Sequence, residues 1–282
     1  MRILERLTQC AAAICIGTFS LMTSQANAGE VTGSVYCDRP TGNCLIKGLA
    51  IKGEIDNKIA EDFRRLIDTF NQQRSQHSQS IDLSGTTINL DSSGGSVLAA
   101  MAIGRLLRSN RMTASVDPYA SCLSSCVLIY AGAVARFGYN PLARIGIHQP
   151  YFQVPDQRID PDTVRNNYNV MLFNIRDYLR EMNVSERLAD EMMKTPPSSI
   201  RYLSGKEQER FGLSLIDPIE RETSALIDAQ KLGLGRMEYN RREALTVDAC
   251  PPDANFSNCR QNIMKTGHSN APDLSMFGTP VK

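Results

Sequence analysis

Apolar side chains recur at steps of three and four residues in several segments of the chain, which is the spacing of one helix face. In the first such segment the members of this face are Ile59, Phe63, Leu66, Ile67 and Phe70. Asp56 precedes them, and its carboxylate can accept hydrogen bonds from the free N–H groups of a first helical turn. We therefore expect a helix that begins after Asp56 and fades in the polar residues 71–80.

The same periodicity predicts further helices. Their expected ranges are 96–107, 122–133, 160–179, 185–194, 204–212 and 220–234. Asp160-Pro161 combines a capping residue with proline at the first helical position, and Ser204 with Glu207 has the spacing of a capping box. Beyond Arg242 the chain is rich in Pro, Asn and Ser, which indicates a surface tail.

Short segments with a strand-like composition lie between these helices. Their expected ranges are 45–55, 86–90, 112–116, 135–139, 144–148 and 213–216. Strand and helix alternate along the chain, and this order is typical of parallel strands joined by right-handed crossovers. The pattern predicts one α/β domain with a mainly parallel sheet.

The first 28 residues have the anatomy of a secretory signal. Arg2 and Arg6 precede an apolar run from Cys10 to Met22, and Ala26 and Ala28 supply the small residues of a cleavage site. A transmembrane anchor is the alternative, but the run is shorter than the about 20 residues that a bilayer core requires. We expect cleavage after Ala28 and a periplasmic or secreted protein with no membrane segment after cleavage.

Export changes the interpretation of the cysteines. Six of them follow the signal: Cys37, Cys44, Cys122, Cys126, Cys250 and Cys259. An even number in an oxidising compartment favours disulfides. The first two and the last two each bracket a turn-rich segment, so local pairing is expected, and a bridge between the middle two is geometrically conceivable. The spacing and the lack of His partners disfavour zinc, and we expect neither a metal nor a cofactor.

The charge of the chain excludes one class of partner. The formal net charge is +1, and Lys and Arg form no cluster or helix face. Nucleic acid binding requires concentrated Lys and Arg to neutralise phosphates. We therefore do not expect nucleic acid as a partner.

Three segments carry residue types that suit acyl-transfer chemistry. Gly94-Gly95 lies where a strand meets a helix, and backbone N–H groups there suit an oxyanion. Ser124 precedes an apolar helix, a place that exposes a nucleophile beside backbone donors. His148 ends an apolar strand, where it is either a hydrogen-bonded structural residue or a base. Taken singly, the glycine pair also fits a tight turn and Ser124 an ordinary helix cap.

In combination the three segments resemble the proteolytic subunit of the Clp protease, and also the related signal-peptide-peptidase A and crotonase-fold groups. The shared order is SxGG, then Ser124 before an apolar helix that ends in Ala-Gly-Ala, then Ile-His-Gln-Pro at residues 147–150. Ser124 and His148 lie 24 positions apart, as in the Clp subunit. The segments RYLS at 201–204 and FGL at 211–213 extend the likeness, which covers residues 45–217.

The resemblance implies a fold of repeated ββα units with a mainly parallel sheet and surrounding helices. The expected organisation is a cleaved signal at 1–28, an N-terminal disulfide segment at 29–44, a catalytic domain at 45–217, and a C-terminal helix with a loop-rich tail at 218–282. The resemblance also implies assembly into a homo-oligomer.

The resemblance further implies that Ser124 attacks a peptide carbonyl and that His148 takes the proton of its hydroxyl. Backbone N–H groups of Gly94 or Gly95 and of Ser125 would hold the oxyanion. Ser125 is the competing nucleophile.

One expected group is missing. The family's catalytic Asp lies shortly before the segment that corresponds to 201–204, whereas residues 194–200 contain no carboxylate. The third member is then a hydroxyl such as that of Thr195, or it is absent.

The sequence predicts a serine peptidase-like hydrolase that cleaves peptides or unfolded segments. A catalytically inactive, Clp-like binding or assembly module is the alternative.

Overall fold

The computed structural model describes residues 28–37, 44–76, 83–138, 142–151, 160–213, 215–250 and 256–268. The expected signal lies outside the described residues except for Ala28, so the prediction of cleavage remains an expectation. The strands are β1 (Glu30–Cys37), β2 (Cys44–Ile55), β3 (Thr87–Gly95), β4 (Thr113–Val116), β5 (Ser121–Leu123), β6 (Ala135–Gly138), β7 (Arg144–Ile147), β8 (Arg201–Tyr202) and β9 (Leu215–Ile216).

These strands form a mostly parallel sheet with two arms that share β3. In one arm β2, β3, β4 and β6 are parallel neighbours, and in the other β3, β5 and β7 are. The strands β1, β8 and β9 pair antiparallel at the margins. The predicted α/β fold with a mainly parallel sheet is confirmed.

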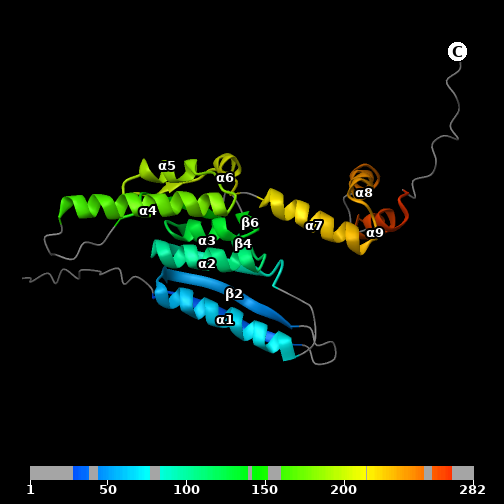
Figure 1. Cartoon of the computed structure of the whole chain (residues 1–282), viewed down its shortest axis with the longest axis horizontal. Helices are drawn as coiled ribbons and strands as arrows, with labels where there is room; N and C mark the ends of the chain where they lie inside the picture. Colours follow the sequence, from blue (N-terminus) through cyan, green and yellow to red (C-terminus); the bar gives the residue numbers. More distant parts are fainter. Residues whose placement is uncertain are drawn as a thin grey trace, which may run out of the picture.

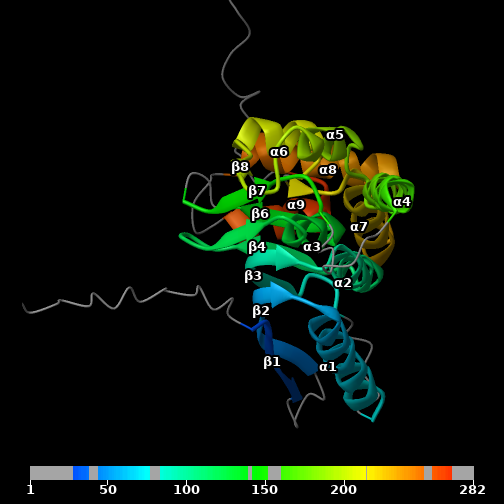
Figure 2. The same cartoon turned by 90° about the vertical axis from the view of Figure 1, so that its left-hand side faces the viewer.

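The helices are α1 (Asn57–Gln76), α2 (Val97–Ser109), α3 (Cys126–Gly132), α4 (Pro161–Glu181), α5 (Arg187–Met193), α6 (Gly205–Phe211), α7 (Pro218–Lys231), α8 (Arg236–Ala249) and α9 (Phe256–Thr266). Figure 1 shows α1 beside β2 and, at the other end of the sheet, α4, α5 and α6. After these elements, α7 leads away from the sheet and its helices to the last two helices, α8 and α9 (Figure 1). Figure 2 shows β1, β2, β3 and β4 side by side, with α1 and α2 along one side of them. No helix in the described part of the chain is long and apolar enough to cross a membrane.

The predicted caps are present. The Asp56 carboxylate accepts from the N–H of Ile59 at 2.8 Å, and α1 buries its predicted apolar face, although the helix continues to Gln76. Asp160 caps α4 ahead of its proline. Ser204 and Glu207 form the predicted capping box of α6, which ends at Gly212 in the left-handed conformation.

The prediction of one helix over residues 122–133 is wrong. Residues 121–123 form β5, and α3 begins only at Cys126. The chain turns at Ser124, whose φ is +57° and whose N–H donates to the Gly146 carbonyl at 2.8 Å. An interstrand hydrogen bond therefore replaces the first turn of the expected helix.

One other prediction needs correction. The chain beyond Arg242 is not the expected loop-rich tail but contains half of α8 and all of α9, whereas the segment 29–44 holds β1 together with the expected Cys37–Cys44 disulfide. The α8 sequence lacks an apolar stripe, which is why periodicity did not predict it. Charged pairs along its surface, such as Arg242 with Glu238, support it instead.

Close helix contacts hold α3 within the core. The Cα of Gly104 on α2 lies 2.4 Å from where a Cβ on Gly132 of α3 would be, so neither position accommodates a side chain. From α4 the buried Tyr178 hydroxyl donates to the Leu128 carbonyl of α3 at 2.7 Å. These contacts fix α3, and with it the serine turn at its start.

Candidate active site

The three predicted segments meet at one edge of the sheet. Gly94 and Gly95 end β3, Ser124 follows β5 and His148 follows β7. These strands are parallel neighbours, with Ser92 opposite Cys122 and Leu123 opposite Gly146. Their carboxyl ends therefore lie together, which is where open α/β sheets place their sites. A cavity of about 540 Å³ opens there, and it is lined by Glu54, Ser93, Gly94, Gly95, Ser96, Val97, Ser124, His148, Pro150 and Tyr151.

Ser124 occupies a strained position at the strand-to-helix turn. Its positive φ is uncommon for a residue other than glycine, and such residues cluster at functional sites. The interstrand bond from its N–H and the bond from the Val127 N–H to its carbonyl, at 3.1 Å, hold the turn from both sides. The side chain is partly exposed and lines the cavity.

The competing nucleophile lies elsewhere. Ser125 is only 3% exposed and does not line the cavity. Its hydroxyl has no hydrogen-bond partner among the described residues. The geometry therefore favours Ser124 over Ser125 as the accessible hydroxyl.

The glycine pair is shaped by contact with the serine turn. Gly94 has a φ of +101°, and a Cβ there would lie 2.6 Å from the Cβ of Ser124. Gly95 has a φ of +146° and is pressed against the Ile55 carbonyl in the same way. The N–H of Gly94 already donates to the Ser92 hydroxyl at 3.0 Å. Of the expected oxyanion donors, Gly95 and Ser125 thus remain the candidates.

His148 is 8% exposed and is held by a main-chain partner. Its Nδ1 lies 2.8 Å from the carbonyl oxygen of Gln149. Because a carbonyl only accepts hydrogen bonds, Nδ1 is the donor in this contact, and in the neutral ring Nε2 then keeps its lone pair. Within the described part of the chain this is the ring's one hydrogen bond. The ring makes no hydrogen bond to Ser124 there. A general base needs this tautomer, because Nε2 can then accept a proton.

Thr195, the expected third member, reaches this region through its main chain. Its carbonyl accepts from the N–H of Gln149 at 2.8 Å. Thr195 is buried, and it lies one peptide unit from the group that contacts the imidazole. Two hydrogen bonds to main-chain carbonyls thus connect the three residues: the His148 ring donates to the Gln149 carbonyl, and the Gln149 N–H donates to the Thr195 carbonyl.

Sequence reasoning missed three contributors. The first is the Gln149 carbonyl, which no residue pattern marks. The second is Glu54, which lines the cavity from the end of β2 and lies opposite Gly94 in the sheet, a pairing that the sequence does not show. The third is Tyr151, whose ring centroid is 5.9 Å from that of His148.

A second hollow of about 410 Å³ adjoins the cavity. It shares Gly95, Ser96, Val97 and Tyr151 with it, and its other lining residues are Leu98, Met101, Asn167, Val170, Met171 and Asn174. Most of these added side chains are apolar, and they come from α2 and α4. The hollow is thus a largely apolar extension of the cavity that Ser124 lines.

The described cysteines are paired as disulfides. Cys37 is joined to Cys44, Cys122 to Cys126 and Cys250 to Cys259. The middle pair, whose pairing the sequence left open, connects β5 to α3 across the Ser124 turn. Both of its cysteines are fully buried.

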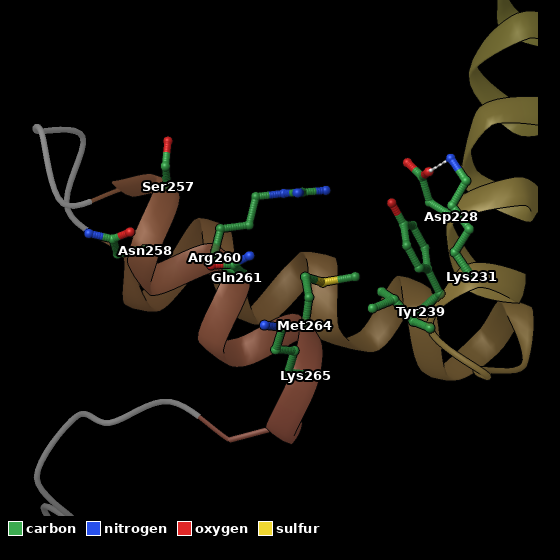
Figure 3. Close-up of a pocket in the computed structure, with 10 residues that line it drawn as sticks. Asp228, Lys231, Tyr239, Ser257, Asn258, Arg260, Gln261, Met264 and Lys265 are labelled. Atoms are coloured by element: carbon green, nitrogen blue, oxygen red, sulfur yellow. Dashed lines mark ion pairs between the residues drawn. The ribbon is translucent and has the colours of Figure 1, made fainter. Parts of the chain in front are cut away.

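A further cavity, of about 480 Å³, lies in the C-terminal helices α7, α8 and α9. Figure 3 shows Tyr239 between the Asp228–Lys231 ion pair of α7 and Met264 of α9. Its lining includes neither Ser124 nor His148. The cavity is thus separate from the candidate active site.

The sequence model of the Clp protease family matches residues 46–222. Among solved structures, a mutant of the membrane-bound stomatin-specific protease 1510-N is 21% identical with a TM-score of 0.41, and the match covers 58% of this chain and 75% of that one. A mutant of ClpP1 from Listeria monocytogenes is 22% identical with a TM-score of 0.43, covering 58% and 86%. No curated protein sequence matches the chain. The matched segment contains the glycine pair, the serine turn and His148.

Proposed function

Because the chain belongs to the Clp protease family, we propose that it is a serine peptidase with Ser124 as nucleophile and His148 as general base. One observation carries the proposal: Ser124, His148 and the glycine pair, which are far apart in the sequence, line a single cavity. The Nδ1-protonated ring supports it, since Nε2 is left free to take a proton.

In the proposed reaction Ser124 Oγ attacks the carbonyl carbon of a peptide bond while its proton passes to Nε2 of His148. The carbonyl oxygen gains the negative charge, and N–H groups of Gly95 and Ser125 are the candidates to stabilise it. His148 returns the proton to the leaving nitrogen, and an acyl-enzyme remains. Water then attacks this ester, gives its proton to His148, and the acid leaves as Ser124 is protonated again.

The proposed substrates are peptides or unfolded protein segments. A peptide has side chains on either side of the cleaved bond, and the adjoining apolar hollow offers a place for one of them.

A fluorophosphonate probe tests the proposal, because it phosphonylates an activated serine. We expect labelling of the wild type, and none in Ser124→Ala or His148→Ala, with melting temperatures close to that of the wild type. Ser125→Ala decides between the two hydroxyls: labelling that survives there but not in Ser124→Ala assigns the nucleophile. A wild-type protein that neither reacts with the probe nor cleaves unfolded casein would favour the inactive binding or assembly module.

We also propose that the protein works in the periplasm after cleavage behind Ala28. The signal-like N-terminus and the three disulfides support this location. Intact-mass analysis of periplasmic material should give a mature chain that begins at Gly29. A full-length chain in the membrane fraction would contradict it.

A further inference from the structure

We propose that the main-chain carbonyl of Gln149, set in place by Pro150 and Thr195, is the positioning group for His148 in place of a catalytic carboxylate. This inference rests on the proposed function, since it concerns the same base. It makes Gln149 a positioning residue that acts through its backbone, so that its side chain has no part in the role.

The first support is the contact itself. The distance from Nδ1 to the Gln149 oxygen is 2.8 Å, a normal length for a hydrogen bond from a ring N–H. The orienting group of a serine–histidine pair must accept from Nδ1 and so leave Nε2 facing the nucleophile. A carbonyl fulfils this requirement, because it cannot donate and excludes the opposite tautomer.

The second support is that the carbonyl is held on both sides. Before it along the chain, the N–H of Gln149 donates to the Thr195 carbonyl at 2.8 Å. After it comes Pro150, whose ring restricts the preceding residue to extended conformations and so limits rotation of the Gln149 carbonyl. Pro150 is itself buried and lines the cavity. The acceptor is therefore fixed without a hydrogen bond from any side chain.

The exchange has a chemical consequence. A carbonyl orients the ring as a carboxylate does, but its dipole stabilises the imidazolium less than a full negative charge would. Turnover should accordingly depend on the tautomer and orientation of His148 more than on a charge partner.

Nitrogen NMR of the mature protein, labelled with ¹⁵N-histidine, measures the tautomer without any substrate. The His148 signals are assigned by their loss in His148→Gln, and the exposed His268 provides an internal reference. At a pH where the ring is neutral, we expect a protonated Nδ1 and a bare Nε2. A ring protonated at Nε2 overturns the inference.

A matched pair of proline variants links the tautomer to turnover. Pro150→Gly releases the Gln149 peptide and should lower kcat on the order of tenfold with KM changed less than about twofold, while the NMR signals show mixed tautomers. Pro197→Gly, an exposed proline of the loop after Thr195, should match the wild type in both measurements. An unchanged kcat in Pro150→Gly, or a lower kcat with the wild-type tautomer retained, overturns the inference.

Failure of the proposed function would look different. The NMR measurement does not depend on activity. An Nδ1-protonated ring in a protein without Ser124-dependent hydrolysis would therefore refute the proposed peptidase function but leave the hydrogen bond from His148 to the Gln149 carbonyl in place. An active enzyme with the opposite tautomer would refute only the positioning role of the Gln149 carbonyl.

Discussion

Gly94 lies against the Ser124 turn more closely than any side chain would allow. A Cβ at this position would be 2.8 Å from the Leu123 carbonyl as well as 2.6 Å from the Ser124 Cβ, and the φ of +101° is strained for any other residue. The glycine therefore lets β3 end directly beside the nucleophile, independently of any bond from its own N–H.

We expect Gly94→Ala to displace the serine turn. Probe labelling should fall at least about tenfold, and the free energy of unfolding should fall by about 1–3 kcal/mol, from overpacking and backbone strain. Gly85→Ala is the matched control, because its φ is also positive, at +77°, but a Cβ there meets open space. It should cost about 1 kcal/mol and leave labelling intact. Equal labelling rates in the two variants would contradict the contact.

At the scale of elements, the junction of β5 and α3 decides how Ser124 is presented. The Cys122–Cys126 bond spans it, so the last part of the strand and the first residue of the helix are covalently joined. The first turn of α3 has no side-chain cap, because Ser125 makes no capping bond. The turn is thus held by the disulfide and by the hydrogen bond from the Ser124 N–H to the Gly146 carbonyl, and not by a helix cap.

Replacing both cysteines of this pair by alanine should slow probe labelling several-fold, because the turn becomes free to leave the left-handed conformation. Closing so short a loop is worth roughly 2 kcal/mol in the chain-entropy description, so most of the protein should remain folded. The Cys250→Ala/Cys259→Ala variant removes a disulfide of the C-terminal helices and should label at the wild-type rate. Labelling that slows equally in both double variants, or peptide mapping that finds free thiols, would argue against this role.

At the scale of the whole molecule, one buried carboxylate connects the sheet body to the C-terminal helices. Asp217 is 1% exposed and caps α7 through the N–H groups of Ile219 and Glu220. Its other oxygen accepts from Arg108 of α2 at 3.0 Å and from Asn183, just after α4, at 3.1 Å. The start of α7 is thereby tied to two helices that pack around α3.

We expect Asp217→Ala to lower the free energy of unfolding by about 3–5 kcal/mol, because it leaves the Arg108 charge without its buried partner. Asp177→Ala is the control: its ion pair with Arg180 is exposed on both sides and is worth at most about 1 kcal/mol. Urea titration of both variants measures the difference. A similar loss in the two variants would show that Asp217 does not anchor the helix.

The same carboxylate predicts a pH dependence. Burial by itself raises the pKa of Asp217, but the hydrogen bonds from Arg108, the Glu220 N–H and Asn183 outweigh it and hold the pKa below its usual range. A carboxyl with a lowered pKa in the folded state stabilises that state above its unfolded pKa, near 3.9. This contribution is lost as the pH falls below about 4. The Asp217→Ala variant should therefore lose less stability than the wild type between pH 5 and pH 3.

What the sequence determined by itself was local. The capping box of Ser204 and Glu207, the Asp160-Pro161 start of α4 and the buried face of α1 all depend on partners within a few positions along the chain. The alternation of strand and helix likewise leaves little choice other than a mainly parallel sheet. The three chemical segments could be found for the same reason, since each is a short motif beside an expected strand or helix.

Only the tertiary structure decided how those segments act. Ser124 adopts its left-handed turn because Gly146, on a neighbouring strand, accepts its N–H, and no local pattern encodes that bond. The partner of His148 is a main-chain carbonyl, which every residue possesses, so its position depends on the Thr195 loop folding against it. The helix α8 was missed because surface ion pairs and the packing of Tyr239 on Met264 support it in place of an apolar stripe. Contacts between residues distant in sequence decide such features, and periodicity does not record them.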